Sequence, residues 1–90
     1  MEITFDPVKR QQTLSERGLD FLDAPEIFKG PNYRFVDERF DYGEVRNVTI
    51  GLLRGRMVVM IWTERGRTRH VISLRKANDR VKRRYQAYLD

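Results

Sequence analysis

The stretch VRNVTIGLLRGRMVVMIWTERGRTRHVISLRK, residues 45–76, carries the clearest structural signal of the chain. Three runs rich in β-branched and other apolar residues are separated by Arg-Gly pairs at 54–55 and 65–66, which are typical of tight turns. The middle run is apolar on both of its faces, as a central strand covered on both sides requires, and Trp62 is expected in the core. This stretch predicts a meander of three strands at residues 45–53, 57–63 and 68–75.

The segments before and after the meander give further helix and strand signals. Asp6 can cap a helix that starts at Pro7, and Gly18 is suited to end it. Asp20 or Asp23 can start a second helix, and Asp23 is favoured as its cap because Pro25 is tolerated only in a first turn. The patterns predict strands at 2–5 and 33–37, a polar loop at 38–44, and helices at 7–17, 23–29 and from about 77 onwards.

These elements predict a single α+β domain over residues 1–90. We expect two N-terminal helices, a mostly antiparallel four-stranded sheet with residues 2–5 as a short extra strand, and a C-terminal helix. All the helices are expected on one side of the sheet. A length of 90 residues corresponds to about one domain, so a doubly wound cofactor-binding fold is disfavoured and an α/β barrel is excluded.

Charge is distributed unevenly along the chain. Residues 1–45 contain six basic and ten acidic residues, whereas residues 46–90 contain twelve basic and three acidic ones. Fourteen of the 18 basic residues are arginines, whose planar guanidinium groups bind phosphate bidentately. The asymmetry predicts a polyanion-binding face built mainly from the C-terminal half.

The composition also excludes several kinds of functional site. The chain has no cysteine and a single histidine, so cysteine chemistry is excluded and a histidine-based metal site is disfavoured. No glycine-rich phosphate loop or other familiar catalytic motif is present, and we expect no metal and no cofactor. Because no apolar run approaches a membrane span and the first residues do not resemble a signal peptide, we expect a cytoplasmic protein without membrane contact.

The cationic candidates lie on one hairpin, one strand and one helix. Strict alternation places Arg69 and Arg75 on one face of the last strand, with Ser73 between them. Two arginines on one face repel each other unless an anion lies between them, which favours this pair as a phosphate site. The wider groove is predicted from Arg65, Arg67, Arg80, Lys82, Arg83 and Arg84.

Three side chains are candidates for moving protons in such a groove. His70 alternates with Ile72 and Leu74, so a structural role on the apolar side is expected for it. Glu64 lies beside a turn, and Tyr85 lies on the apolar stripe of the last helix. The residues alone leave both a structural and a catalytic role open for these two.

Short motifs follow one another along the chain in a characteristic order. They are FDPxK at 5–9, Gly18 and Phe21, DYGE at 41–44, TIG at 49–51, TERG at 63–66, ISxRxA at 72–77 and RY at 84–85. In this order they resemble the BrnT-type toxins of bacterial type II toxin–antitoxin systems. Each motif is short, but together they span nearly the whole chain.

The resemblance implies a compact fold related to the RelE ribonuclease toxins and cleavage of RNA without a metal. It also implies a ribbon-helix-helix antitoxin as partner. In the implied complex, an antitoxin dimer joins two toxins, and the antitoxin, not the toxin, contacts promoter DNA. Carried over to this chain, Arg69 and Arg75 would hold the scissile phosphate, and Glu64 or Tyr85 would assist proton transfer. The flanking phosphates would be bound by Arg65, Arg67, Arg80 and Arg84.

One departure from the family pattern concerns the end of the first helix. The family commonly has Lys-His-Gly there, whereas this chain has Glu16-Arg17-Gly18. Arg17 can contact a phosphate but is a poor base at neutral pH, so activity would depend on another group. The competing hypotheses are a non-catalytic nucleic-acid-binding module and a protein-interaction module with a basic face. Binding of RNA without formation of a product would favour the first of these, and a neighbouring small gene with a ribbon-helix-helix pattern would favour the toxin over the second.

Overall fold

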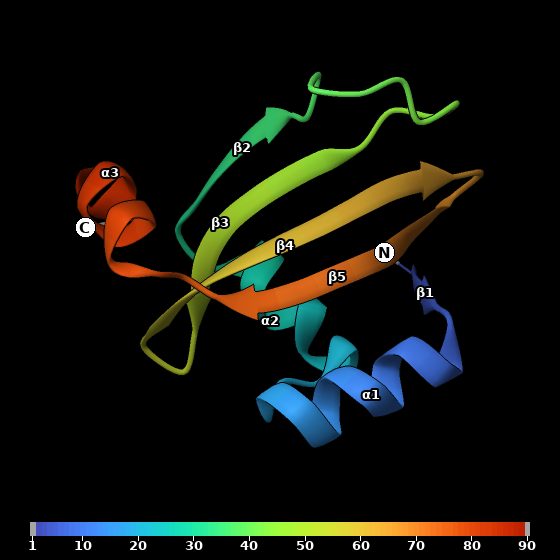
Figure 1. Cartoon of the computed structure of the whole chain (residues 1–90), viewed down its shortest axis with the longest axis horizontal. Coiled ribbons are helices and arrows are strands. Elements are labelled where there is room, and N and C mark those ends of the chain that lie inside the picture. Colours follow the sequence, from blue (N-terminus) through green and yellow to red (C-terminus); the bar gives the residue numbers. More distant parts are fainter. Residues whose placement is uncertain (1, 90) are drawn as a thin grey trace.

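The predicted meander is the centre of the computed structural model, which describes residues 2–89 of the chain (Figure 1). Its strands are β3 (Asn47–Leu53), β4 (Arg56–Arg65) and β5 (Thr68–Lys76), and each pairs antiparallel with the next. The turns between them contain Gly55 and Gly66, which both have positive φ angles that suit glycine. The strands predicted from the Arg-Gly spacing are therefore confirmed.

Two further strands extend the sheet at its edges. β2 (Asn32–Val36) pairs antiparallel with β3, and β1 (Glu2–Phe5) pairs parallel with β5. The resulting five-stranded sheet has the order β1-β5-β4-β3-β2. The α+β class and the short N-terminal strand are confirmed, but the complete sheet is mixed because β1 runs parallel to its neighbour.

The helices begin and end close to their predicted boundaries. α1 (Pro7–Arg17) starts after Asp6, whose carboxylate accepts the N–H of Val8 at 2.9 Å, and it ends at Gly18 in the left-handed conformation. A short 3₁₀ turn, η1 (Phe21–Asp23), leads into α2 (Ala24–Lys29), and α3 (Asp79–Leu89) follows β5. No helix among residues 2–89 is long and apolar enough to cross a membrane.

The cap of the second helical segment differs from the expectation. Asp23 directly precedes α2 but makes no capping hydrogen bond with its side chain. Instead, Asp20 accepts the N–H of Leu22 at 2.9 Å, because the 3₁₀ turn moves the first unpaired N–H groups three residues upstream. The prediction of Asp23 as the capping side chain is therefore wrong.

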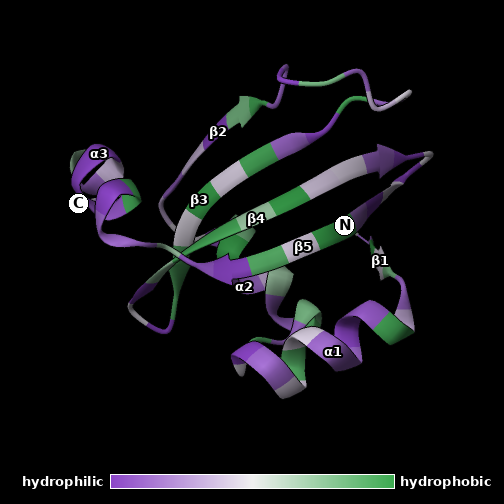
Figure 2. Ribbon diagram, viewed as in Figure 1, coloured by the Kyte–Doolittle hydropathy of each residue, from purple (hydrophilic) through white to green (hydrophobic). Residues whose placement is uncertain are grey.

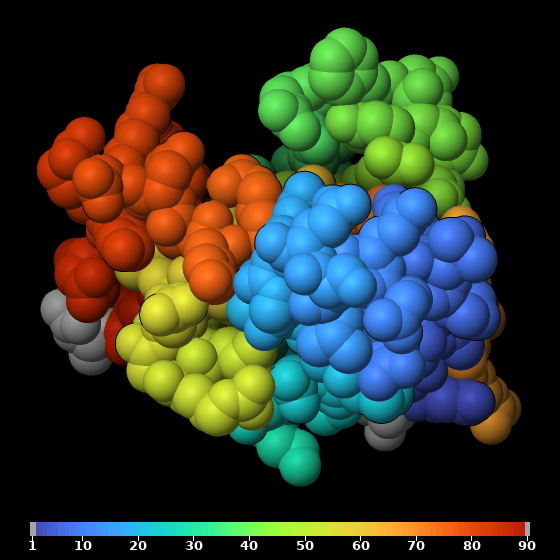
Figure 3. Space-filling view, turned by 60° about the horizontal axis from the view of Figure 1, so that its bottom comes forward, coloured from blue at the N-terminus to red at the C-terminus, as the bar shows by residue number. Residues whose placement is uncertain are grey.

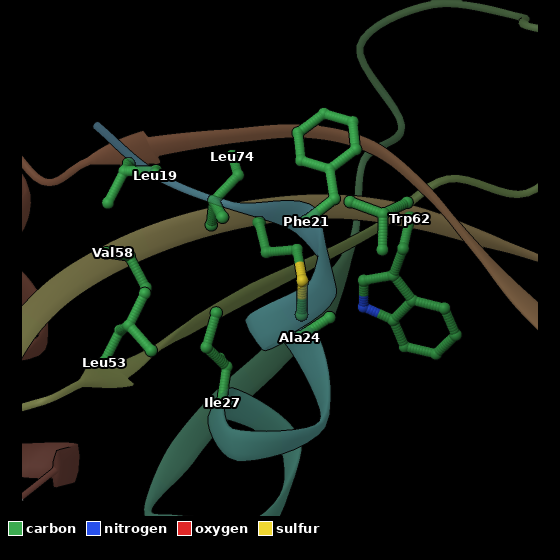
Figure 4. Close-up of a cluster of buried hydrophobic side chains, with 10 residues drawn as sticks. Leu19, Phe21, Ala24, Ile27, Leu53, Val58, Trp62 and Leu74 are labelled. Carbon is green, nitrogen blue, oxygen red and sulfur yellow. The ribbon is translucent and has the colours of Figure 1, made fainter. Parts of the chain in front are cut away.

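Each face of the sheet carries its own apolar cluster. The cluster on the side of α1 and α2 contains Leu19, Phe21, Ala24, Ile27, Leu53, Val58, Met60, Trp62, Val71 and Leu74 (Figure 4). The cluster on the opposite face, which α3 covers, contains Val48, Ile50, Met57, Val59, Ala77 and Leu89. Figure 2 shows that hydrophilic residues dominate the surfaces of α1 and α3, as expected for helices that cover a sheet from outside.

The prediction that all helices lie on one side of the sheet is thus wrong. Alternate residues of β4 enter the two clusters, so both faces of this strand must be shielded from water. α1 and α2 shield one face only. The C-terminal helix crosses to the other face and shields it.

A β-bulge in β5 changes which side chains share a face. Ile61 of β4 is opposite Ser73, but the next residue, Trp62, is opposite Val71, so Ile72 has no partner of its own. As a result, Val71 and Leu74 both enter the cluster on the side of α2. Strict alternation predicts them on opposite faces, and that prediction is wrong because of the extra residue.

A close approach between the sheet and α2 allows a test of this packing. A Cβ atom on Gly51 would lie 2.8 Å from Cγ2 of Ile27, which is fully buried. We expect Gly51→Ala to lower the free energy of unfolding by about 1–3 kcal/mol, as overpacking does. The measurement is urea unfolding followed by circular dichroism. Gly30→Ala is the control, since a Cβ there meets only the Glu26 carbonyl oxygen at 3.8 Å, and an equal loss of stability in both variants would contradict the argument.

Candidate functional site

The β-bulge separates the two arginines that were expected to act together. Arg69 lies on the side of α2, where its Cζ is 4.4 Å from the ring centroid of Phe28 and 4.7 Å from that of Trp62. Arg75 lies beyond the bulge, opposite Val59, and faces the side of α3. The prediction that they share one face is wrong, and they cannot hold one phosphate between them.

A pocket of about 360 Å³ lies on the face of the sheet that α3 covers. Its floor is apolar and is formed by Val48, Ile50, Val59 and Ile61 from the two central strands β3 and β4. Its rim carries four of the predicted site residues, Arg75, Arg80, Arg84 and Tyr85. The structure therefore brings half of the predicted set together around an apolar floor.

The three arginines of the rim are available to bind an anion. All three are exposed, and among residues 2–89 none of them forms an ion pair with a carboxylate. They come from two elements, Arg75 from β5 and the other two from one face of α3, four residues apart. Like charges held this close favour an anionic ligand that reduces their repulsion.

The opposite side of the pocket is formed by the segment 37–39, which a buried carboxylate holds in place. The carboxylate of Asp37 accepts two hydrogen bonds from the Arg39 guanidinium, both at 2.9 Å, and one from the Tyr42 hydroxyl at 3.0 Å. The Arg39 guanidinium is the main reason that the pKa of Asp37 lies well below its usual range. The negative charge of Asp37 is thus already neutralised, whereas Glu38 is exposed and lines the pocket beside it.

Tyr85 is part of an aromatic group at the end of the pocket. Its ring lies 6.1 Å from that of Phe35 with an interplanar angle of 11°, and 5.4 Å from that of Tyr33. Tyr88 stacks on Tyr33 at 4.4 Å. Tyr85 is half-buried and also lines the pocket, so it packs against β2 and at the same time reaches the candidate site.

Arg17 lies next to the pocket, on the other side of Arg75. Its Nη1 donates to the Leu74 carbonyl oxygen at 3.0 Å, and it lines a shallow depression together with Glu16, Arg75 and Lys76. In Figure 3 the end of α1 directly meets the orange segment that leads into α3. Arg75 borders both hollows, so the positive surface continues from the pocket to the end of α1.

The other half of the predicted set lies at the β4–β5 hairpin, outside the pocket. Glu64 is opposite Arg69 in the strand register, Arg65 contacts Glu44 at 3.4 Å, and Arg67 is in the turn. None of these residues lines the pocket. The hairpin and the pocket are therefore two separate cationic surfaces.

Arg69 has a clear structural task at this hairpin. Arg34 and Arg69 both cover the ring of Trp62, with Cζ atoms 4.9 and 4.7 Å from its centroid, and Trp62 is fully buried. The indole N–H of Trp62 donates to the Thr49 hydroxyl at 2.8 Å. The expectation of Trp62 in the core is confirmed, and the guanidinium of Arg69 is occupied by its contact with aromatic faces.

His70 also lies outside the pocket. Its Nδ1 is 2.9 Å from the Thr4 hydroxyl oxygen, which links β5 to β1. Partial burial is the main cause that lowers the pKa of His70 below its ordinary value. The structural role expected for His70 agrees with this position. Among residues 2–89, no three His, Asp or Glu side chains come together in a group that could hold a metal ion.

Sequence reasoning did not identify the segment 37–39 as part of the site, because the polar run predicts only a solvated loop. The spacing of Asp37 and Arg39 gave a local signal, since an aspartate can accept hydrogen bonds from a residue two positions later. No signal in the sequence pointed to Glu38. Its place at the pocket depends on the path of the loop between β2 and β3.

The contact of Arg69 with the aromatic rings gives a testable consequence. We expect Arg69→Ala to lower the free energy of unfolding by about 1–2 kcal/mol and to shift the Trp62 fluorescence to longer wavelength, because the indole loses its cover. Arg67→Ala, in the neighbouring turn, is the control for loss of one positive charge. An unchanged fluorescence spectrum and stability in Arg69→Ala would contradict the structural role.

The ion pair of Asp37 predicts a pH-dependent stability. Because the pKa of Asp37 is lower in the folded chain than its unfolded value of about 3.9, the pair stabilises the fold above that pH, and this contribution is lost as the pH falls further. We expect Asp37→Asn to be less stable than the parent at pH 7, with the difference shrinking below about pH 4. Thermal unfolding from pH 7 to pH 2 measures it, with the exposed Asp41→Asn as control. A difference that stays constant over this range would rule out the proposed cause.

Comparison with known proteins supports a specific assignment. Residues 5–80 match the family described as the ribonuclease toxin, BrnT, of type II toxin–antitoxin systems. None of the curated proteins compared with the chain matches it. The family match includes Arg75 and Arg80 and stops before Arg84 and Tyr85, which lie on the remainder of α3. Because the match spans most of the sequence, the chain belongs to the BrnT family of ribonuclease toxins from type II toxin–antitoxin systems.

Proposed function

We propose that this chain is a metal-independent endoribonuclease and that the pocket between α3 and the sheet is its RNA site. The observation that carries the proposal is the rim of the pocket, where three exposed arginines stand above an apolar floor and, among residues 2–89, form no ion pair with a carboxylate. Guanidinium groups suit the phosphodiester backbone, and the apolar floor with Tyr85 and Phe35 suits the flat face of a base. The family assignment supplies the reaction class, cleavage of RNA.

The proposed reaction uses a nucleophile that the RNA itself provides. The 2′-oxygen attacks the adjacent phosphorus as the bond from phosphorus to the 5′-oxygen breaks. The products are a 2′,3′-cyclic phosphate and a free 5′-hydroxyl. Negative charge develops on the non-bridging oxygens in the transition state, and guanidinium groups already in position stabilise it. We assign this stabilisation to Arg75, Arg80 and Arg84.

Two proton transfers accompany this displacement, and the pocket offers one group for each. The carboxylate of Glu38 accepts the proton of the 2′-hydroxyl, and the hydroxyl of Tyr85 donates a proton to the leaving 5′-oxygen. Both side chains line the pocket, at opposite sides of it. Glu64 lies on the hairpin and does not line the pocket, so we assign it no part in these transfers.

The neighbouring depression extends the proposed site along the RNA strand. Arg17 and Lys76 flank Arg75 there and are placed to bind the next phosphate of the backbone. Arg17 occupies the position where family members commonly have a histidine, and we assign it to binding. The predicted phosphate contacts of Arg65 and Arg67 would belong to a longer RNA that reaches the hairpin.

We further propose that cleavage blocks translation in the cytoplasm and that a ribbon-helix-helix antitoxin prevents it. In this assembly an antitoxin dimer joins two toxins, and contact with DNA is made by the antitoxin. The support is the toxin–antitoxin family to which the chain belongs.

A non-catalytic nucleic-acid-binding module is the second candidate. The observation that favours it is Arg17, because a guanidinium in place of the family's histidine binds phosphate but does not accept a proton at neutral pH. RNA that binds to the folded protein and stays intact would establish this reading.

Cleavage of RNA in the presence of EDTA tests whether this site is enzymatic. The assay uses purified RNA and, separately, RNA in a translation extract. We expect Arg75→Ala and Arg84→Ala to lower the cleavage rate about 100-fold or more, since each removes a donor to the transition-state charge. Arg83→Ala is a matched control, because Arg83 is exposed on α3 but does not line the pocket. Equal rates for all three variants at matched folding, or cleavage that disappears with EDTA, would overturn the proposal.

A further inference from the structure

We propose that the antitoxin binds this toxin as an additional β-strand along the free edge of β2. The segment that binds is expected to alternate apolar and acidic side chains. This inference depends on the assignment to a toxin–antitoxin family and not on the cleavage mechanism. Only its account of inhibition depends on the proposed position of the RNA site.

The backbone of β2 is open to pairing along its outer edge. This strand is the last one of the sheet, so its outer edge has no strand partner among residues 2–89. The N–H of Asp37 donates to the Arg46 carbonyl oxygen at 2.8 Å and therefore points toward β3. Direction alternates along an antiparallel strand, so the N–H and C=O groups of Arg34 and Val36 point outward. An extended peptide can pair with these groups.

Apolar side chains around this edge are exposed. Large apolar residues are usually buried, yet several of them here are exposed together on β2, the loop that follows it, and α3. Their exposed fractions are 37% for Phe35, 46% for Val36, 66% for Phe40, 61% for Val45 and 61% for Tyr88. A strand added along the edge of β2 would cover apolar side chains on both faces of the sheet.

The charge of β2 favours one of two occupants. Arg34 is the middle residue of β2, so a second copy of this chain pairing symmetrically would set two Arg34 side chains against each other. An acidic side chain opposite Arg34 makes a favourable cross-strand pair instead. Arg80 and Arg84 stand near the same edge around the pocket, which adds to the preference for an acidic partner.

The register predicts the pattern of the bound segment and its effect. Tyr33 and Phe35 point to the face of α3, whereas Arg34 points to the face of Trp62. The partner strand would therefore place apolar residues beside the two aromatic rings and an acidic residue beside the arginine. Phe35 and Val36 also line the pocket, so a strand lying along them restricts access to it. Binding of the antitoxin at this edge would then also block access of RNA to the pocket.

Proline substitution tests this geometry without removing a bond inside the sheet. Val36→Pro deletes an N–H that points outward, and proline is tolerated at such edge positions. Val36→Thr keeps the N–H and the β-branched shape and is the matched control. With the purified antitoxin protein of the same module, we expect Val36→Pro to weaken binding at least 100-fold and Val36→Thr to change it only a few-fold. Equal affinities of the two variants, both folded by circular dichroism, would overturn the proposal.

Amide hydrogen exchange of the unaltered toxin gives an independent answer if the proline variant does not fold. We expect the amides of Arg34 and Val36 to exchange at least 100-fold more slowly in the antitoxin complex than in the free toxin. Unchanged exchange at both amides, or slow exchange already in the free toxin together with a dimeric mass, would overturn the proposal. Neither measurement uses RNA, so failure of the RNA cleavage test and failure of this inference can be told apart.

Discussion

The architecture depends on one constraint, the apolar character of both faces of β4. Val58, Met60 and Trp62 need a cover on one side, and Met57 and Val59 need one on the other. α1 and α2 lie between β1 and β2 in the chain and supply the first cover. The second cover is supplied by α3, the last element of the described chain. Because α3 is basic and packs against β2 and β3, Arg80 and Arg84 lie at the rim of a pocket and not on a plain helix surface. The candidate site is thus a consequence of how the second face is covered.

The bulge at Ile72 then determines which arginine faces that pocket. With strict alternation, Arg69 and Arg75 would lie on the same side of the sheet. The extra residue leaves Arg69 over Phe28 and Trp62 and turns Arg75 toward α3. One inserted residue therefore assigns one arginine to the core and one to the candidate site. This division explains why a cluster of arginines close in sequence does not form a single binding surface.

The sequence was sufficient to predict the helices and strands because the signals for them are local. Gly18, the Arg-Gly turns and the apolar run of β4 each act within a few residues, and the predicted boundaries lie close to the observed ones. The bulge and the position of α3 depend on contacts between distant segments, so no local sequence pattern predicts them. For the same reason Arg75, Arg80, Arg84 and Tyr85 could be predicted as site residues by type, whereas their separation from Glu64 and Arg69 could not. Glu38 could not be predicted at the pocket, because its position depends on the path of a loop that sequence patterns do not determine.

The acidic first half of the chain acquires a function in this arrangement. Its carboxylates form ion pairs with arginines. Three of these groups lie away from the pocket: Asp20 with Arg10, Asp23 and Glu26 with Arg54, and Glu44 with Arg65. The fourth, Asp37 with Arg39, is part of the pocket wall and is already neutralised. Exposed ion pairs contribute little to stability, so their main effect is on where positive charge remains uncompensated. Within the described residues, none of these carboxylates pairs with Arg75, Arg80 or Arg84. Positive charge therefore stays uncompensated at the rim of the pocket and at the neighbouring end of α1, where an anionic strand would meet it.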